Sequence, residues 1–280
     1  MNREDMRVAA AVRRELPQIA RAIEATVNSL ERGGHLFYVG AGTSGRIAVL
    51  DAAECPPTFG VSPQKVRAIV AGGPKALRRA IEGAEDSPRD GARDLRRAAI
   101  SRRDVVVVLS ASGATPYALG ALDYARRIGA VTIGLTANSD SPLAKRARIA
   151  IAPDTGPEVI TGSTRLKAGT AQKLVLNMLS TAAMVRLGRI YDNWMVSMAL
   201  TNGKLRERGT RILEAAAGVN ARAAEHALRQ GGHDLPVALV MLKTGAGSAQ
   251  AKRSLRSTGG NIRRAVGMGK NGRRGSAGKE

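Results

Sequence analysis

Apolar positions along the chain switch between two spacings. Over residues 4–31 they recur three and four residues apart, which predicts a helical segment that ends at Gly33-Gly34. Short apolar runs follow, separated by stretches with helical spacing near 45–53, 74–84, 115–128 and 141–147. The runs, each expected to be a strand, cover residues 36–39, 66–70, 105–109, 131–135 and 149–152. This alternation predicts βαβ units around a five-stranded parallel sheet, an α/β fold.

The pattern changes in the last third of the chain. A long, largely apolar helix is expected over residues 165–188, and beyond Lys204 short amphipathic segments predict a small appendage of three helices. We therefore expect a main domain at 1–204 and a helical subdomain at 205–266. The last residues, 267–280, are rich in Gly, Lys and Arg, and we expect them to form a disordered basic tail.

Composition narrows the class of protein. Hydrophobic residues make up 44% of the 280 residues but aromatic ones only 2%, so aliphatic side chains must build the core, as in parallel sheets covered by helices. The single cysteine, Cys55, excludes an intrachain disulfide and a multi-thiolate metal site, and agrees with a reducing compartment. No apolar run approaches the roughly 18 residues of a membrane span, and the N-terminus is too charged for a signal peptide. We expect a cytoplasmic protein without membrane contact.

The formal charge of +21 raises the question of a nucleic-acid partner. Much of the excess lies after Met241, and the few aromatic residues are not clustered with it. Proteins that bind single strands usually interleave basic residues with aromatic ones on which bases stack. Nucleic acid is therefore not the expected partner.

A glycine-rich loop follows the first predicted strand. Its sequence G-A-G-T-S-G, residues 40–45, fits the dinucleotide pattern G-x-G-x-x-G. That pattern also needs an acidic residue for the ribose after the next strand, and none occurs from Gly60 to Leu77. The loop instead places Gly42, Thr43 and Ser44 at the start of a helix, where backbone N–H groups and the helix dipole favour a phosphate.

A second hydroxyl-rich loop follows the third predicted strand. It reads S-A-S-G-A-T-P and holds Ser110, Ser112, Gly113 and Thr115. Either loop alone fits helix capping equally well. Because both leave the carboxyl ends of parallel strands, where open α/β sheets bind ligands, together they favour a sugar-phosphate site.

Carboxylates near these loops are candidates for acid and base catalysis. Most single acids on helices are solvated charges. Glu54, however, lies beside Cys55 and two prolines, and Glu85 lies in a tight turn, so we expect the direction of each side chain to be fixed. Two carboxylates near one pocket can divide the roles of general acid and general base. The carboxylates of this group are Asp51, Glu54, Glu82, Glu85 and Asp86.

Other residues are weaker candidates for catalysis or for binding a metal or ligand. A core thiol is the better interpretation of Cys55 than a nucleophile, because no histidine lies near it in sequence, and the three histidines lack metal-ligand spacing. We expect no metal site. Ser163 and Lys167, at the start of the long helix, are either capping residues or a third edge that contacts the ligand.

The motifs closely resemble those of the N-acetylmuramic acid 6-phosphate etherases, in the sugar isomerase (SIS) domain superfamily that includes the glucokinase regulatory protein. The resemblance extends from about Val8 to about Val266 and rests on G-A-G-T-S-G-R-I-A-V-L-D-A-A-E-C-P-P, E-G-A-E-D, S-A-S-G-A-T-P, the segment 157–191 and T-N-G-K-L. It implies a three-layer sandwich with a five-stranded parallel sheet and a small UBA-like helical subdomain.

The resemblance also implies a lyase that cleaves the D-lactyl ether of N-acetylmuramate 6-phosphate. The open-chain sugar loses its C2 proton, D-lactate leaves from C3 and water adds, which yields N-acetylglucosamine 6-phosphate. By motif match, Glu54 is the proton donor and Glu85 the second acid/base residue. No cofactor or metal is implied, and family members are homodimers. The residues that the resemblance and the loops together assign to the sugar phosphate are Gly42, Thr43, Ser44, Ser110, Ser112, Gly113, Thr115, Ser163 and Lys167.

The chain departs from the family pattern in three places. Family members have some forty residues before the opening helix, Ala114 stands where the family has an arginine, and Asp192 and Ser197 replace an expected Gly and Asp. A non-catalytic sugar-phosphate regulator and a phosphosugar isomerase are therefore the alternatives to the etherase.

Overall fold

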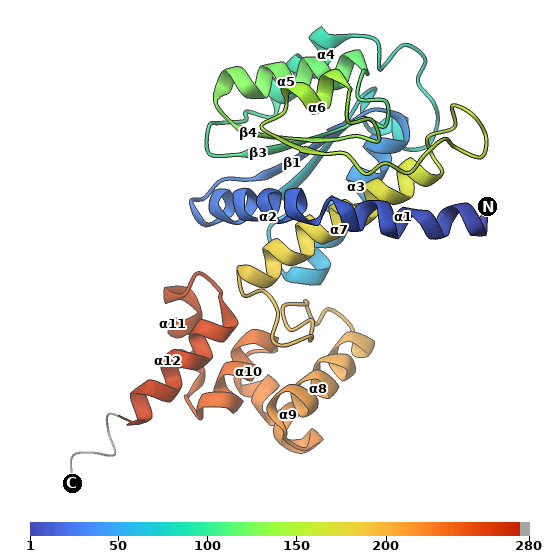
Figure 1. Cartoon of the computed structure of the whole chain (residues 1–280). Coiled ribbons are helices and arrows are strands. Elements are labelled where there is room, and N and C mark those ends of the chain that lie inside the picture. The colour runs from blue at the N-terminus through green and yellow to red at the C-terminus, as the bar shows by residue number, and fades with distance from the viewer. Residues whose placement is uncertain (275–280) are drawn as a thin grey trace. The chain divides into compact units, whose positions relative to one another are not determined.

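The computed structural model describes residues 1–274, with side chains to residue 268 (Figure 1). The chain forms two compact units. The first holds Met1–Cys55 and Ser62–Ala183, and the second holds Pro56–Val61 and the chain from Met184 onward.

The first unit is built on a five-stranded sheet in which every neighbouring pair is parallel, as predicted. Its order is β2-β1-β3-β4-β5. All residues of the central strands β1 and β3 are buried, which explains why they are continuous apolar runs. The strands are β1 (Leu36–Gly40), β2 (Val66–Val70), β3 (Val105–Leu109), β4 (Val131–Leu135) and β5 (Ile149–Ile151).

Helices cover both faces of this sheet. In Figure 1, α4, α5 and α6 lie on one face, and α2 and α7 lie on the other. The expected helical segment at 4–31 is two helices, because Pro17 opens the second one. The helices of this unit are α1 (Asn2–Arg14), α2 (Leu16–Glu31), α3 (Gly42–Phe59), α4 (Pro88–Arg97), α5 (Pro116–Ile128), α6 (Pro142–Arg146) and α7 (Lys167–Arg186). The last residues of α3 and α7 lie beyond the unit.

The prediction of a helix at 74–84 is wrong. That segment holds only a 3₁₀ turn, Gly73–Leu77, followed by irregular chain up to α4. Gly72, Gly73 and Gly83 have positive φ angles of 81°, 67° and 69°, which lie outside the helical region. The crossover helix begins instead after Ser87, whose Oγ accepts a hydrogen bond from the Asp90 N–H (3.2 Å).

Helices α4 and α5 pack backbone against backbone. A Cβ atom at Gly91 would overlap the carbonyl oxygen of Tyr117, and one at Gly120 would overlap that of Pro88. Between the helices, the Tyr117 hydroxyl donates to Asp94 (2.9 Å). Only glycine at both positions allows so close an approach.

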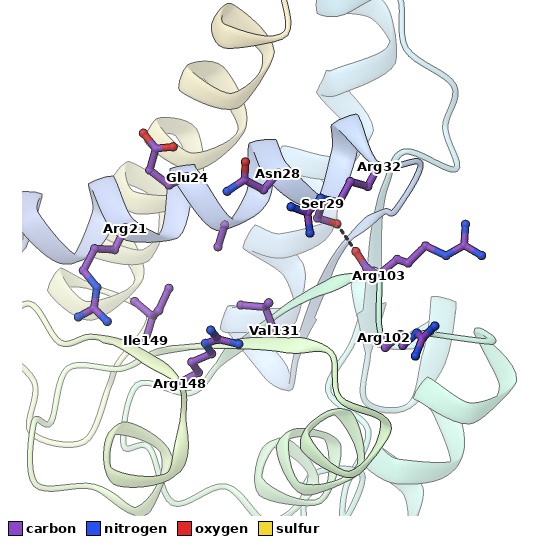
Figure 2. Close-up of a pocket in the computed structure, with 11 residues that line it drawn as sticks. Arg21, Glu24, Asn28, Ser29, Arg32, Arg102, Arg103, Val131, Arg148 and Ile149 are labelled. Carbon is purple, nitrogen blue, oxygen red and sulfur yellow. Dashed lines mark hydrogen bonds between the residues drawn. The ribbon is translucent and has the colours of Figure 1, made fainter.

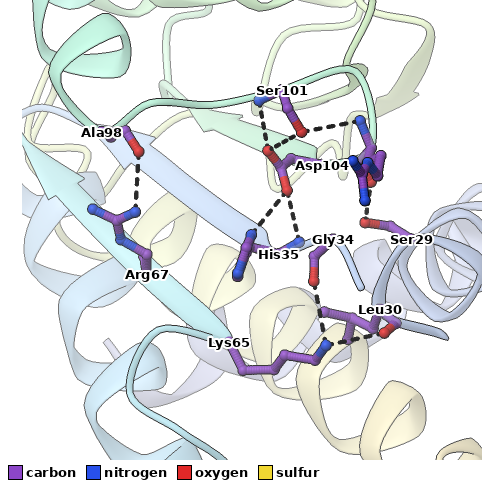
Figure 3. Close-up of polar contacts among 10 residues, drawn as sticks. Ser29, Leu30, Gly34, His35, Lys65, Arg67, Ala98, Ser101 and Asp104 are labelled. Atoms are coloured by element: carbon purple, nitrogen blue, oxygen red, sulfur yellow. Dashed lines mark hydrogen bonds and ion pairs between the residues drawn. The ribbon is translucent and has the colours of Figure 1, made fainter. Parts of the chain in front are cut away.

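A buried carboxylate joins the starts of β1 and β3 (Figure 3). Asp104 accepts hydrogen bonds from the backbone N–H groups of His35 (2.8 Å) and Ser101 (2.6 Å). It also accepts from the Ser101 hydroxyl (2.9 Å) and lies 3.0 Å from His35 Nδ1. Burial acts to raise the pKa of Asp104, but the hydrogen bonds from Ser101 and His35 together outweigh it and hold the pKa below its usual value.

The second unit contains five helices over its described residues, where three were expected. Its core is centred on α10, the most apolar of them, and α11 and α12 were missed because they place few apolar residues on it. The helices are α8 (Gly203–Ala217), α9 (Ala221–Gln230), α10 (Leu235–Thr244), α11 (Ser248–Ser257) and α12 (Ile262–Arg274).

Both ends of the second unit differ from the expected boundaries. The C-terminal part of the unit begins at Met184 and not near Lys204, and Val196 and Met198 are buried in its core. Helix α12 runs to Arg274, so residues 267–274 are helical where a disordered tail was expected. The remaining residues of that expected tail, 275–280, lie outside the described residues.

Candidate functional site

The glycine loop after β1 allows helix α3 to begin directly against the sheet. Gly42 has a φ of +52°, and a Cβ atom at Gly45 would lie 2.7 Å from the Gly40 carbonyl oxygen and 2.5 Å from a Val70 methyl group. Thr43 is half-buried and Ser44 is buried in the first turn. The first N–H groups of an 18-residue helix therefore lie at the carboxyl edge of the sheet, a position suited to an anion.

The loop after β3 forms a connected cluster of hydroxyl groups. Ser110 Oγ lies 2.8 Å from Thr115 Oγ1 and 3.3 Å from Ser112 Oγ. Ser110 Oγ also accepts from the Gly113 N–H (3.0 Å), and Ser112 Oγ accepts from the Ala114 N–H (3.2 Å). The cluster thus presents several groups that can donate to phosphate oxygens.

Sheet register brings these two loops together. Gly40, the last residue of β1, pairs with Leu109, the last residue of β3. Strand neighbours lie about 4.8 Å apart, so the two loops leave the sheet side by side. The expected juxtaposition of Thr43 and Ser44 with the Ser110 loop is therefore present.

The first turn of α7 contacts the glycine loop. A Cβ atom at Gly169 would lie 3.4 Å from Thr43 Cγ2, so the two segments are close neighbours. Glu158 caps this helix, since its carboxylate accepts from the N–H groups of Lys167 and Ala168 (3.0 Å each). Ser163, on the preceding turn, is half-buried.

The ammonium group of Lys167 is buried and paired. Its side chain is 1% exposed, and Nζ donates to Glu4 Oε2 at 2.8 Å. This hydrogen bond lowers the pKa of Glu4. Lys167 therefore links helix α1 to α7 in this structure.

Glu85 is held beside the hydroxyl loop by its backbone. Its carbonyl oxygen accepts from the N–H of Tyr117 (3.0 Å), two residues after Thr115. The Asp86 N–H donates to the Gly83 carbonyl oxygen (3.2 Å), which closes the expected turn. The Glu85 side chain is exposed and thus free to contact a ligand at the carboxyl edge.

Glu54 lies elsewhere on α3. It is exposed, and it follows Ser44 by ten residues, which is about 15 Å along a helix axis. Asp51, one turn earlier, hydrogen-bonds Tyr38 in the middle of β1, so Glu54 lies beyond the middle of the sheet. Within one chain the structure brings Glu85, and not Glu54, to the hydroxyl loops.

Asp51 is the centre of a buried polar network that the sequence did not reveal. Its carboxylate accepts from the Tyr38 hydroxyl (2.9 Å) and the Ser180 hydroxyl (3.1 Å). The side-chain amide of Asn177 is oriented so that its nitrogen donates to Asp51 (3.1 Å) and its oxygen accepts from Lys173 Nζ (2.8 Å). The network joins β1, α3 and α7, and no local motif predicts it because Ser180 lies 129 residues from Asp51 in the sequence.

Burial controls the ionisation of this network. Desolvation raises the pKa of Asp51 and raises that of Tyr38 further. It also raises the pKa of Cys55 to about 12, with Asp51 as the second cause, while the thiol donates to the Asp51 carbonyl oxygen (3.3 Å). Cys55 is therefore a protonated core thiol, which agrees with the preferred interpretation of the sequence.

The described residues contain no group of three or more histidine, cysteine or acidic side chains that could hold a metal ion. Strand β2 is followed by Ala71, Gly72 and Gly73, so no carboxylate stands where a dinucleotide fold binds ribose. The two loops at the carboxyl edge of the sheet thus offer hydroxyl groups and backbone N–H groups to a ligand.

Comparison with known proteins decides the family. The chain is 52% identical over 266 residues to N-acetylmuramic acid 6-phosphate etherases of Yersinia pestis and Yersinia pseudotuberculosis, a span of 95% of this chain and 90% of each relative. The chain belongs to the N-acetylmuramic acid 6-phosphate etherase family. Family models agree: residues 18–126 match the glucokinase regulatory protein N-terminal SIS domain, and residues 86–182 match the SIS domain.

Solved structures support the fold assignment. A phosphoheptose isomerase of Neisseria gonorrhoeae superposes with a TM-score of 0.51 at 17% identity and covers 64% of this chain and 92% of its own. The expected SIS-type fold, with its five-stranded parallel sheet flanked by helices, is therefore confirmed.

Proposed function

We propose that this protein is a lyase that cleaves the D-lactyl ether of N-acetylmuramate 6-phosphate, giving N-acetylglucosamine 6-phosphate and D-lactate. The observation that carries the proposal is the identity of 52% over 95% of the chain with etherases. The hydroxyl-rich loops at the carboxyl edge of the sheet support a sugar-phosphate substrate independently of that identity.

The phosphate group would bind between the first turn of α3 and the Ser110 loop. Thr43 and Ser44 offer hydroxyl and backbone N–H donors at a helix N-terminus, and Ser112 and Thr115 offer hydroxyl donors from the other side. Gly42 and Gly113 let the backbone approach the ligand closely. Ser163 and Lys167 complete the third edge of this site.

The reaction needs a base for the C2 proton and an acid for the departing ether oxygen. The C2 proton lies next to the aldehyde of the open-chain sugar, so a carboxylate is a sufficient base. The ether oxygen leaves from C3 as the D-lactate hydroxyl once it is protonated, and water then adds across the double bond. We assign one of these roles to Glu85, beside the Ser110 loop, and the other to Glu54. No cofactor is required.

We further propose that the protein is a homodimer in which Glu54 of one protomer completes the site of the other. The support is the distance of about 15 Å along α3 between Ser44 and Glu54, which separates them within one chain. A two-fold axis makes two equivalent sites of this kind.

We propose a cytoplasmic location, because the substrate would be a phosphorylated sugar. None of the helices in the described part of the chain is both long and apolar enough to cross a bilayer.

Release of D-lactate from N-acetylmuramate 6-phosphate tests the function. Glu85→Gln removes one acid/base group and is expected to lower kcat by roughly 10²–10⁴-fold. Glu82→Gln is the matched control, since Glu82 is an exposed carboxylate in the same connection. Saturable binding of N-acetylglucosamine 6-phosphate without any lactate release would favour a non-catalytic sugar-phosphate regulator. The match with the glucokinase regulatory protein domain and the alanine at position 114 support that alternative.

Mixing two inactive variants tests the shared site. If Glu54 acts across the dimer, equal amounts of Glu54→Gln and Glu85→Gln subunits, after exchange, form mixed dimers with one intact site. About one quarter of wild-type activity should then return. Activity that stays at the level of the parent variants after verified exchange would place both carboxylates in one chain.

A further inference from the structure

A basic cavity lies at the edge of the sheet opposite the hydroxyl loops (Figure 2). Its volume is about 670 Å³, within the range of small-ligand pockets. Val131 and Ile149, at the starts of β4 and β5, form part of its wall together with α2. Strands of five residues span about 16 Å, which separates this cavity from the candidate sugar-phosphate site.

Five arginines line this cavity and only one acid does. They come from three separate segments: α2 and its C-terminal cap, the turn before β3, and the connection before β5. Residues far apart in sequence are thus brought to one place by the fold. The charged residues are Arg21, Arg32, Arg102, Arg103, Arg148 and Glu24.

Most of these guanidinium groups are not neutralised by the protein. Arg21 donates to Gln18 (2.9 Å), but over the described residues the guanidinium groups of Arg32, Arg102, Arg103 and Arg148 have no hydrogen bond or ion pair. Like charges around one cavity raise its positive potential, and an anion bound there would relieve the repulsion.

The arrangement indicates what kind of anion fits. Strands β3 and β5 are separated by β4, so the backbones of Arg103 and Arg148 lie at least about 10 Å apart, further than a single phosphate extends. Arginine side chains bind phosphate oxygens in a bidentate manner. None of the lining residues is aromatic, so the cavity offers no surface on which a base would stack.

We propose that this cavity is a second anion site, which binds a small ligand carrying two or three linked phosphate groups. Asn28 and Ser29 from α2 lie on the same wall, and the Ser29 hydroxyl donates to the Arg103 carbonyl oxygen (2.6 Å), which fixes the turn that carries Arg102 and Arg103. The site is independent of the etherase reaction and would exist even if the proposed function were wrong.

Calorimetric titration of the full-length protein with tripolyphosphate tests the proposal. Saturable binding with about one ligand per chain is expected, at least tenfold tighter than binding of orthophosphate at equal ionic strength. The double variant Arg103→Ala/Arg148→Ala should lose at least tenfold in affinity. Both side chains are exposed, so thermal unfolding of the variant should match that of the wild type.

The control variant removes the same charge elsewhere. Arg253 and Arg256 are exposed on α11, and Arg253→Ala/Arg256→Ala should bind tripolyphosphate as the wild type does. Equal losses in the two double variants would mean that the overall charge of +21 alone attracts the ligand, and would overturn the proposal. Displacement of tripolyphosphate by N-acetylglucosamine 6-phosphate would overturn it too, because the ligand would then occupy the hydroxyl loops. A single-stranded oligonucleotide that binds more tightly than tripolyphosphate and depends on Arg103 and Arg148 would instead assign the cavity to nucleic acid.

Discussion

Replacement of Gly113 by alanine tests whether the geometry of the Ser110 loop governs substrate binding. Gly113 has a φ of +69°, where an alanine costs roughly 1–2 kcal/mol. A Cβ atom there would also overlap Ser141 and would lie 2.8 Å from Thr136 Oγ1. Neither neighbour yields easily, since Ser141 Oγ caps α6 by accepting from Ala144 N–H (3.3 Å) and Thr136 Oγ1 donates to the Ala111 carbonyl oxygen (3.1 Å).

The overlap adds to the cost of the backbone conformation. Overpacking of a dense site typically costs about 1–3 kcal/mol, so Gly113→Ala should lower the free energy of unfolding by about 2–5 kcal/mol in total. The strain is relieved by moving the loop outward, which displaces Ser110 and Ser112. Because catalytic sites are sensitive to displacements of about 1 Å, KM for the sugar phosphate should rise roughly tenfold or more.

The control separates backbone strain from overlap. Gly156 has a φ of +66° and no atom within 4 Å of its hypothetical Cβ atom. Gly156→Ala should therefore cost only about 1–2 kcal/mol and leave KM unchanged. Urea unfolding and lactate-release kinetics measure both quantities. If the two variants lose the same stability and Gly113→Ala keeps the wild-type KM, the loop is not the phosphate site described above.

Three further variants or reactions probe the surroundings of the site. Asp104→Asn turns an acceptor into a donor facing two backbone N–H groups, and should cost about 2–4 kcal/mol in urea unfolding at pH 7. Because the folded pKa of Asp104 is lowered, its stabilisation is present above about pH 4 and is lost as the pH falls through the folded pKa; a pH-independent difference from wild type would contradict this. Glu158→Ala removes the cap of α7 and should cost about 1–2 kcal/mol, whereas Glu207→Ala, an exposed control, should cost less than about half that. Cys55, with a pKa of about 12, has roughly one thiol in ten thousand ionised at pH 8, so mass spectrometry should find it unmodified by iodoacetamide in the native protein and alkylated in urea.

The sequence predicted the sheet well because strands buried on both faces leave an unmistakable local pattern. Runs such as that of β3, which is almost all valine, are short and continuous, and the helices between them keep their own spacing. The hydroxyl loops were predictable for the same reason, since topology alone places the ends of parallel strands at one edge. Both predictions depend only on patterns that are local in the sequence.

What the sequence could not predict depends on contacts between distant segments. The apolar spacing over 74–84 resembles a helix, but the chain forms only a 3₁₀ turn there, and the positive φ angle of Gly83 lies outside the helical region. The position of Glu54 along α3 follows from helix length only once the direction of α3 against the sheet is known. The partners of Asp51 and Lys167, and the arginines around the basic cavity, come from segments that no spacing rule connects.

The close packing of α4 on α5 has a mechanical consequence for the site. Glu85 precedes α4 by three residues and its carbonyl oxygen is bonded to the first turn of α5, so the carboxylate and the hydroxyl cluster are attached to the same glycine-locked pair of helices. Any opening of the substrate entrance that separated them would have to break this helix pair. The chain can instead bend before Glu85, around Gly83, without altering the spacing between Glu85 and the Ser110 loop. Insertions or substitutions in residues 78–82 should thus leave the spacing between Glu85 and the Ser110 loop unchanged. A single methyl group at Gly91 or Gly120 should alter that spacing.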